Sequence, residues 1–107
     1  MLEREGYNFI MDNKEKIKEA INNSGIYSPN QCKIIGVLLD ISTNNIAQAS
    51  VQFLEEKTGV KKPTIYFALK VFQKDGLIIK NQQLGGFELQ QTKLDFLLES
   101  YKKKSLI

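Results

Sequence analysis

The segment from residue 50 to residue 86 constrains the fold of this chain more than any other part. Ser50 is a residue type that caps the start of a helix, and Gly59 is the type that most often ends one. Pro63 suits the first turn of a following helix, where its missing N–H costs nothing. The segment therefore predicts two short helices joined by a tight turn.

The second predicted helix has one apolar side and is followed by a hairpin. Its apolar residues recur at helical spacing on one buried face: Ile65, Ala68, Leu69 and Phe72. Gly76 ends this helix, Leu77 begins a β-prone run, and Gly85-Gly86 lets the chain turn back. Two helices and a hairpin in this order are typical of a winged helix-turn-helix, which places its second helix against the major groove of DNA.

We therefore expect a mainly α fold with a small β hairpin (α+β). It is predicted to be a single winged helix-turn-helix domain over residues 1–107, with extra N-terminal and C-terminal helices. The helix-turn-helix is expected at about 50–75, the wing at about 77–91 and the C-terminal helix at about 92–104. A chain of 107 residues is long enough for one hydrophobic core.

The part of the chain before this segment predicts two more helices and a short strand. Asp12 or Asn13 can cap a helix that runs to Asn23. Ser28 opens a second helix whose apolar residues cover most of its circumference, so we place this helix at the centre of the core. Residues 46–47 are expected to add a third strand beside the hairpin.

Most of the basic excess of the chain lies on the second helix of the motif and at the base of the hairpin. Residues 61–80 hold five lysines and one acid, a net charge of +4 (5 − 1), whereas the whole chain carries +3. Lysines that neutralise phosphates release counterions, which gives an affinity for DNA that falls steeply with salt. The residues expected to contact DNA are Lys61, Lys62, Thr64, Tyr66, Phe67, Lys70, Lys74, Lys80, Gln82 and Gln83.

This predicted surface favours A·T-rich duplex DNA as the partner. Arginine makes the commonest contact to guanine, and the only arginine, Arg4, lies far along the chain from the motif. Phe67 can rest against thymine methyl groups or against a second subunit, and these two interpretations stay open here. The wing tip at residues 81–86 carries no charge, so it can meet either the DNA or another protein.

The composition argues against catalysis and against a metal site. The chain has no histidine, and Cys32 is the only cysteine, which we expect to be a small buried hydrophobe. The acidic residues are scattered, and there is no phosphate-binding loop or dinucleotide fingerprint. We expect a protein that is not an enzyme, with no catalytic residue, no cofactor and no bound metal.

Apolar residues outside the predicted core point to a homodimer, since paired DNA-binding domains read two half-sites. The residues expected at the dimer interface are Phe9, Ile10, Phe67, Phe96 and Tyr101. No apolar run approaches the length of a membrane span, and the N-terminus does not have the layout of a secretory signal. We therefore expect a cytoplasmic protein that makes no contact with a membrane.

The K-P-T start of the second helix at residues 62–64, the extra N-terminal helix, the long final helix and the short length resemble the TubR proteins. These are centromere-binding proteins of plasmid and phage partition systems, and they work with TubZ, a tubulin-like GTPase. The resemblance implies dimers that array on repeated DNA sites, hand the DNA to a filament and can repress their own operon. It also implies that the second helices of a dimer enter one major groove together. On this chain, the residues that would then serve both DNA binding and dimerisation are Lys62, Thr64, Tyr66, Phe67 and Lys70.

Two alternatives stay open. K-P-T at a helix start also occurs in MarR-like and ArsR-like repressors, so an ordinary transcriptional repressor is the nearest alternative. An ArsR-type metal sensor needs cysteine and histidine, which are largely absent from this chain. The alternative from another class is a winged domain that contacts proteins, with its lysines solvated.

Overall fold

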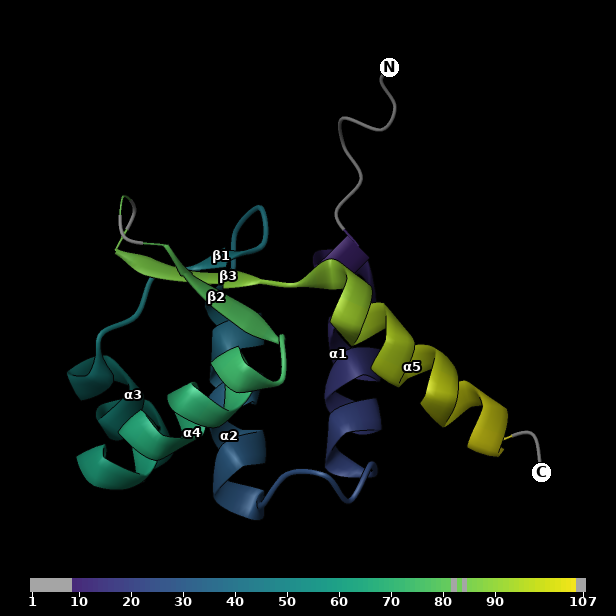
Figure 1. Cartoon of the computed structure of the whole chain (residues 1–107), viewed down its shortest axis with the longest axis horizontal. Helices are drawn as coiled ribbons and strands as arrows, with labels where there is room; N and C mark the ends of the chain where they lie inside the picture. The colour runs from purple at the N-terminus through teal and green to yellow at the C-terminus, as the bar shows by residue number, and fades with distance from the viewer. Residues whose placement is uncertain (1–8, 82, 84, 106–107) are drawn as a thin grey trace.

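The computed structural model describes residues 9–81, 83 and 85–105, which form five helices and a three-stranded antiparallel sheet (Figure 1). In chain order the elements are α1 (Phe9–Asn22), α2 (Pro29–Ile41), β1 (Ile46–Ala47), α3 (Val51–Thr58), α4 (Lys62–Lys74), β2 (Ile78–Asn81), β3 (Gly86–Leu89) and α5 (Gln91–Ser105). The fold is mainly α with a small antiparallel sheet, and this coarse prediction is confirmed.

Helix α2 lies at the centre of the molecule, as its apolar circumference predicts. It begins with a reciprocal cap, in which the backbone N–H of Gln31 donates to Ser28 Oγ at 3.1 Å and the N–H of Ser28 donates to Gln31 Oε1 at 3.0 Å. The helix packs against α1, α3, α4 and β1. Its fully buried residues are Ile34, Ile35, Leu38 and Leu39.

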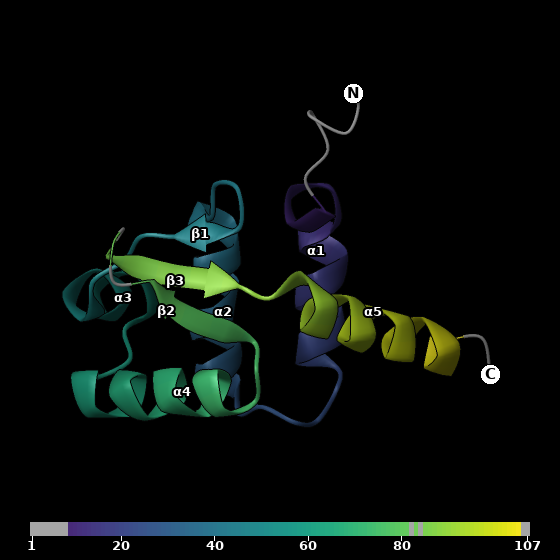
Figure 2. The ribbon, with the colours of Figure 1, turned by 45° about the horizontal axis from the view of Figure 1, so that its top comes forward.

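Helices α1 and α5 pack against each other on the side of α2 that lies away from α3 (Figures 1 and 2). The predicted first helix has one further turn at its N-terminal end: α1 begins at Phe9, and its two helical pieces meet at Asn13, one of the two expected caps. Asn13 forms a kink within the helix, with φ −117° and ψ 15°. Ile10 is 1% exposed, so burial of this extra turn against the core favours the longer helix.

The predicted third strand is present, and the sheet has the order β1-β3-β2. Ala47 of β1 pairs with Phe87 of β3, and Ile78 of β2 pairs with Leu89. Gly86 opens β3 where the chain passes very close to β1: a Cβ added at this position would lie 2.5 Å from the carbonyl oxygen of Ala47. Only glycine leaves room for this approach.

The local signals between residues 50 and 76 are confirmed one by one. Ser50 Oγ accepts a hydrogen bond from the N–H of Phe53 at 3.0 Å, which caps α3. Gly59 ends α3 with φ +75°, and Gly76 follows α4 with φ +80°. Pro63 lies in the first turn of α4. The predicted inner face of α4 is buried as a whole: Ile65, Ala68, Leu69 and Phe72.

Candidate nucleic-acid interface

Helix α4 presents one long side to solvent. Figure 2 shows it along the outer border of the molecule, with the sheet and α2 on its inner side. At about 100° of rotation per residue, Phe67, Lys70 and Lys74 point directly away from the buried face. Tyr66 lies to one side of this outer row and is 57% exposed. The outer surface of α4 therefore combines lysines with two aromatic rings.

Nearly all of the residues predicted to contact DNA are exposed, most of them on α4 or at its N-cap and the others on the hairpin. The exposed ones are Lys61, Lys62, Thr64, Tyr66, Phe67, Lys70, Lys74, Lys80 and Gln83. Lys80 lies on β2, which packs against α4, so its charge adds to that of the helix. Gln82 lies outside the described residues.

No carboxylate among the described residues neutralises the positive charge of this surface. Residues 61–74 contain no aspartate or glutamate. No carboxylate of the part of the chain that the structure describes forms an ion pair with Lys70, Lys74 or Lys80, nor with the two lysines at residues 61–62. Free ammonium groups on one helix face raise the local positive potential and attract polyanions.

The start of α4 adds to this potential. Lys61 is the N-cap residue, but its side chain makes no capping hydrogen bond. The first backbone N–H groups of a helix have no partner within the helix, and the aligned peptide dipoles give this end a partial positive charge. Two adjacent lysines therefore stand at the positive end of the helix, a combination that favours anions such as phosphate.

Tyr27, which precedes α2, holds the C-terminal end of α4 in place. Its hydroxyl donates a hydrogen bond to the carboxylate of Asp75 at 2.9 Å, and its ring meets the ring of Phe72 edge-on at 5.6 Å. Burial, and then the hydrogen bond to Asp75, raise the pKa of Tyr27 above its ordinary value. Sequence reasoning missed this pair because its members lie 48 positions apart and neither belongs to a recognisable motif.

Replacing Tyr27 with phenylalanine is expected to lower the free energy of unfolding by about 1.5 kcal/mol at pH 8, since a hydrogen bond to a carboxylate is lost. The raised pKa sets the pH dependence of this contribution. It is complete below about pH 10, where unfolded tyrosine is protonated, and it is lost as the pH rises toward the folded-state pKa. In urea unfolding, the difference in free energy of unfolding between wild type and Tyr27→Phe should therefore become smaller from pH 8 to pH 11. A difference that stays constant over this pH range would contradict the stabilising role of the Tyr27 hydroxyl.

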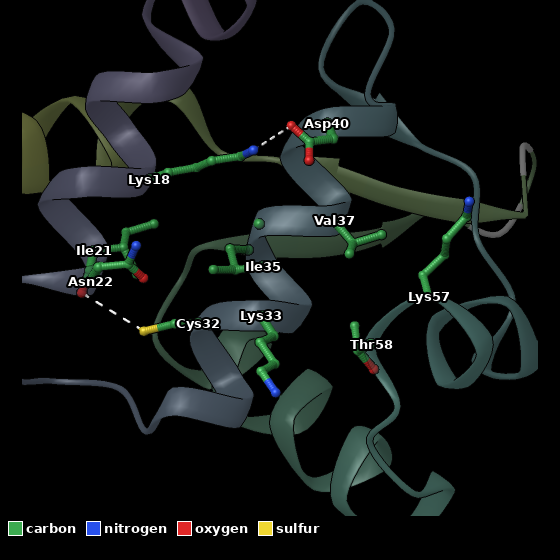
Figure 3. Close-up of a pocket in the computed structure, with 11 residues that line it drawn as sticks. Lys18, Ile21, Asn22, Cys32, Lys33, Ile35, Val37, Asp40, Lys57 and Thr58 are labelled. Atoms are coloured by element: carbon green, nitrogen blue, oxygen red, sulfur yellow. Dashed lines mark hydrogen bonds and ion pairs between the residues drawn. The ribbon is translucent and has the colours of Figure 1, made fainter.

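A hollow of about 350 Å³ lies between α1, α2 and α3, but its polar groups do not converge (Figure 3). Lys18 turns to the carboxylate of Asp40, which neutralises it. Lys33 and Lys57 point in different directions, away from each other. Sites for small molecules gather a few polar groups around one position, so this hollow does not have the features of a ligand site.

Cys32 at the border of this hollow is partly buried, whereas we expected it to be fully buried. Its thiol lies 3.8 Å from the carbonyl oxygen of Tyr27, and burial raises its pKa. A raised pKa keeps the thiol neutral and unreactive. Among residues 9–81, 83 and 85–105, no group of three cysteine, aspartate or glutamate side chains is arranged to hold a metal ion.

The residues expected at a dimer interface lie on three different helices, α1, α4 and α5. Ile10 is buried in the core of its own chain, which removes it from that set. Tyr101 is partly buried, and its hydroxyl donates to Glu19 Oε2 of α1 at 2.7 Å. Phe96 on α5 and Phe67 on α4 are exposed, whereas the side chain of Phe9 lies outside the described part.

No protein-family model, no curated protein and no solved structure matches this chain. None of the described helices combines the length and the apolar character that crossing a membrane requires. Function is therefore inferred from the geometry and charge of α4 and its neighbours.

Proposed function

We propose that this chain binds double-stranded DNA as a winged helix-turn-helix, with α4 as the helix that enters the major groove. The order α2-β1-α3-α4-β2-β3, with α3 and α4 joined at Gly59, supports this assignment. One observation carries the proposal: the exposed side of α4 holds lysines that have no ion-pair partner among the described residues. The hairpin of β2 and β3 takes the role of the wing.

The test is a salt titration with random-sequence duplex DNA, measured by fluorescence anisotropy. If most of the five lysines between residues 61 and 80 contact phosphates, log Kd should change with log salt with a slope of magnitude about 3 to 5. Affinity should then fall roughly a hundredfold or more between 50 and 200 mM salt. Absence of binding at 50 mM, or a slope of magnitude below about 1, would refute DNA binding and favour a protein-binding winged domain with solvated lysines.

The proposal includes a homodimer, because two domains read two half-sites. Phe96 is 62% exposed on α5, and it borders a small apolar hollow with Ile26, which is 57% exposed. Large exposed apolar side chains of this kind are typical of contact surfaces. Among DNA-binding functions, we propose centromere binding in partition, together with repression of the protein's own operon. The support is that α4 opens with K-P-T, and that along the chain the motif is preceded by an extra helix, α1, and followed by a long final helix, α5. A tubulin-like GTPase would then be the second partner.

Replacing Phe96 with glutamate is expected to weaken dimerisation at least about thirtyfold, the effect of losing a central apolar anchor of roughly 2 kcal/mol. Sedimentation velocity over a range of protein concentrations measures this change. The same substitution at Ile79, which is 53% exposed on β2, is the matched control and should leave the dimer intact. A wild-type chain that stays monomeric at high concentration would contradict the dimer. A dimer weakened only by the Ile79 substitution would assign the interface to the sheet.

A further inference from the structure

Phe67 stands out on the basic face of α4 because nothing described in the protein covers its ring. It is 62% exposed, and no aromatic ring or lysine ammonium of the described residues contacts it. Phe96 is equally exposed, but Lys93 Nζ lies over its ring at 5.7 Å. Exposing an aromatic ring to water costs free energy. An uncovered ring in the middle of a charged helix face therefore indicates that a binding partner covers it.

The position of Phe67 on the helix indicates which partner. Phe67, Lys70 and Lys74 form the outermost row of α4, directly opposite the buried face. A helix that lies in the major groove turns its outermost row into the groove, where the short side chain of Phe67 meets the base edges. The long side chains of Lys70 and Lys74 can carry their ammonium groups from the same row to the phosphate backbones. Phe67 is the one large apolar side chain of this row, since Tyr66 lies to the side.

This inference rests on the proposed DNA binding, which brings Phe67 against the edges of the bases. In the major groove, thymine presents an apolar group, its C5-methyl, whereas the edges of the other three bases present hydrogen-bond donors and acceptors. A phenyl ring can gain contact with that methyl but cannot satisfy the polar edges. We propose that Phe67 reads thymine through the C5-methyl group and thereby gives this protein its preference for A·T pairs.

The experiment uses duplexes that differ only in this methyl group. Binding of the full chain is measured to an alternating dA-dT duplex and to the same duplex with deoxyuridine in place of thymidine. Each methyl buried against the ring should make the thymine duplex bind about fourfold tighter. An alternating dG-dC duplex with and without 5-methylcytosine offers the same C5-methyl group in a duplex that has no thymine. Methylation of this duplex should increase its affinity for the protein.

Three variants assign the effect to this side chain. Phe67→Ala should bind the thymine and uracil duplexes equally, while its slope with salt stays that of wild type because no charge is removed. Ile79→Ala, which removes an exposed apolar side chain from β2 and not from α4, should keep the full preference. Phe67→Leu should keep part of it, since leucine is still apolar.

The outcomes separate this inference from the proposed function. Salt-dependent binding of wild type with equal affinity for both duplexes would overturn the thymine contact and leave DNA binding standing. Absence of binding to either duplex would overturn the proposed function itself. If Phe67→Ala loses the preference and also changes its oligomeric state in sedimentation, Phe67 belongs to a subunit interface and the thymine contact is overturned.

Discussion

Exchanging both Lys70 and Lys74 for glutamate is expected to lower the affinity for duplex DNA about a hundredfold at 100 mM salt. These two ammonium groups lie on the outermost row of α4 and have no ion-pair partner among the described residues. Each lost phosphate contact flattens the slope of log affinity against log salt by about 0.9, so the slope should fall by about 1.8. Fluorescence anisotropy at several salt concentrations measures both quantities.

The matched control carries the same change of charge elsewhere. Lys103 and Lys104 are exposed on the last turn of α5, and the glutamate pair at these positions also changes the net charge by −4 (2 × −2). If α4 forms the contact, the control should keep the wild-type slope and lose affinity only through the long-range field, by a factor of a few at 100 mM salt. Equal losses in the two variants would show that net charge alone governs binding and would contradict the role of α4.

Replacing Phe72 with alanine is expected to lower the free energy of unfolding by roughly 3–5 kcal/mol, the largest stability effect that we predict. Phe72 is fully buried at the middle of the inner face of α4, and its ring meets Tyr27 edge-on. The substitution removes this contact and leaves a cavity that the surrounding helices can fill only in part. Urea unfolding followed by circular dichroism gives the difference.

The control for this prediction is Phe67→Ala, which removes the same ring from an exposed position of the same helix. Its free energy of unfolding should stay within about 0.5 kcal/mol of wild type. A loss below about 1 kcal/mol in Phe72→Ala would mean that α4 is not held by its apolar face. Because that face and Tyr27 together orient α4, Phe72→Ala should also weaken DNA binding under conditions where the protein stays folded.

Local signals predicted most of the segment between residues 50 and 89, because caps, turns and periodicity depend on residues close in sequence. Ser50 caps a helix through a neighbour three positions away, and Gly59 ends it through its own φ angle. The exposure of Lys70 and Phe67 follows equally from the helical repeat around Ile65. These signals did not predict the turn of α1 before Asn13, because the burial of Ile10 that favours this turn depends on contacts with distant parts of the chain.

The spacing of apolar residues along α4 is enough to predict which of its residues face outward, since a helix of this periodicity has only one way to bury its apolar stripe. Three other features become visible only in the folded chain: Tyr27 meets Asp75, Gly86 passes within contact of Ala47, and Ile10 belongs to the core. These contacts join residues far apart along the chain, and they depend on the packing of the whole core. Patterns of residues that are close in sequence do not predict such long-range contacts.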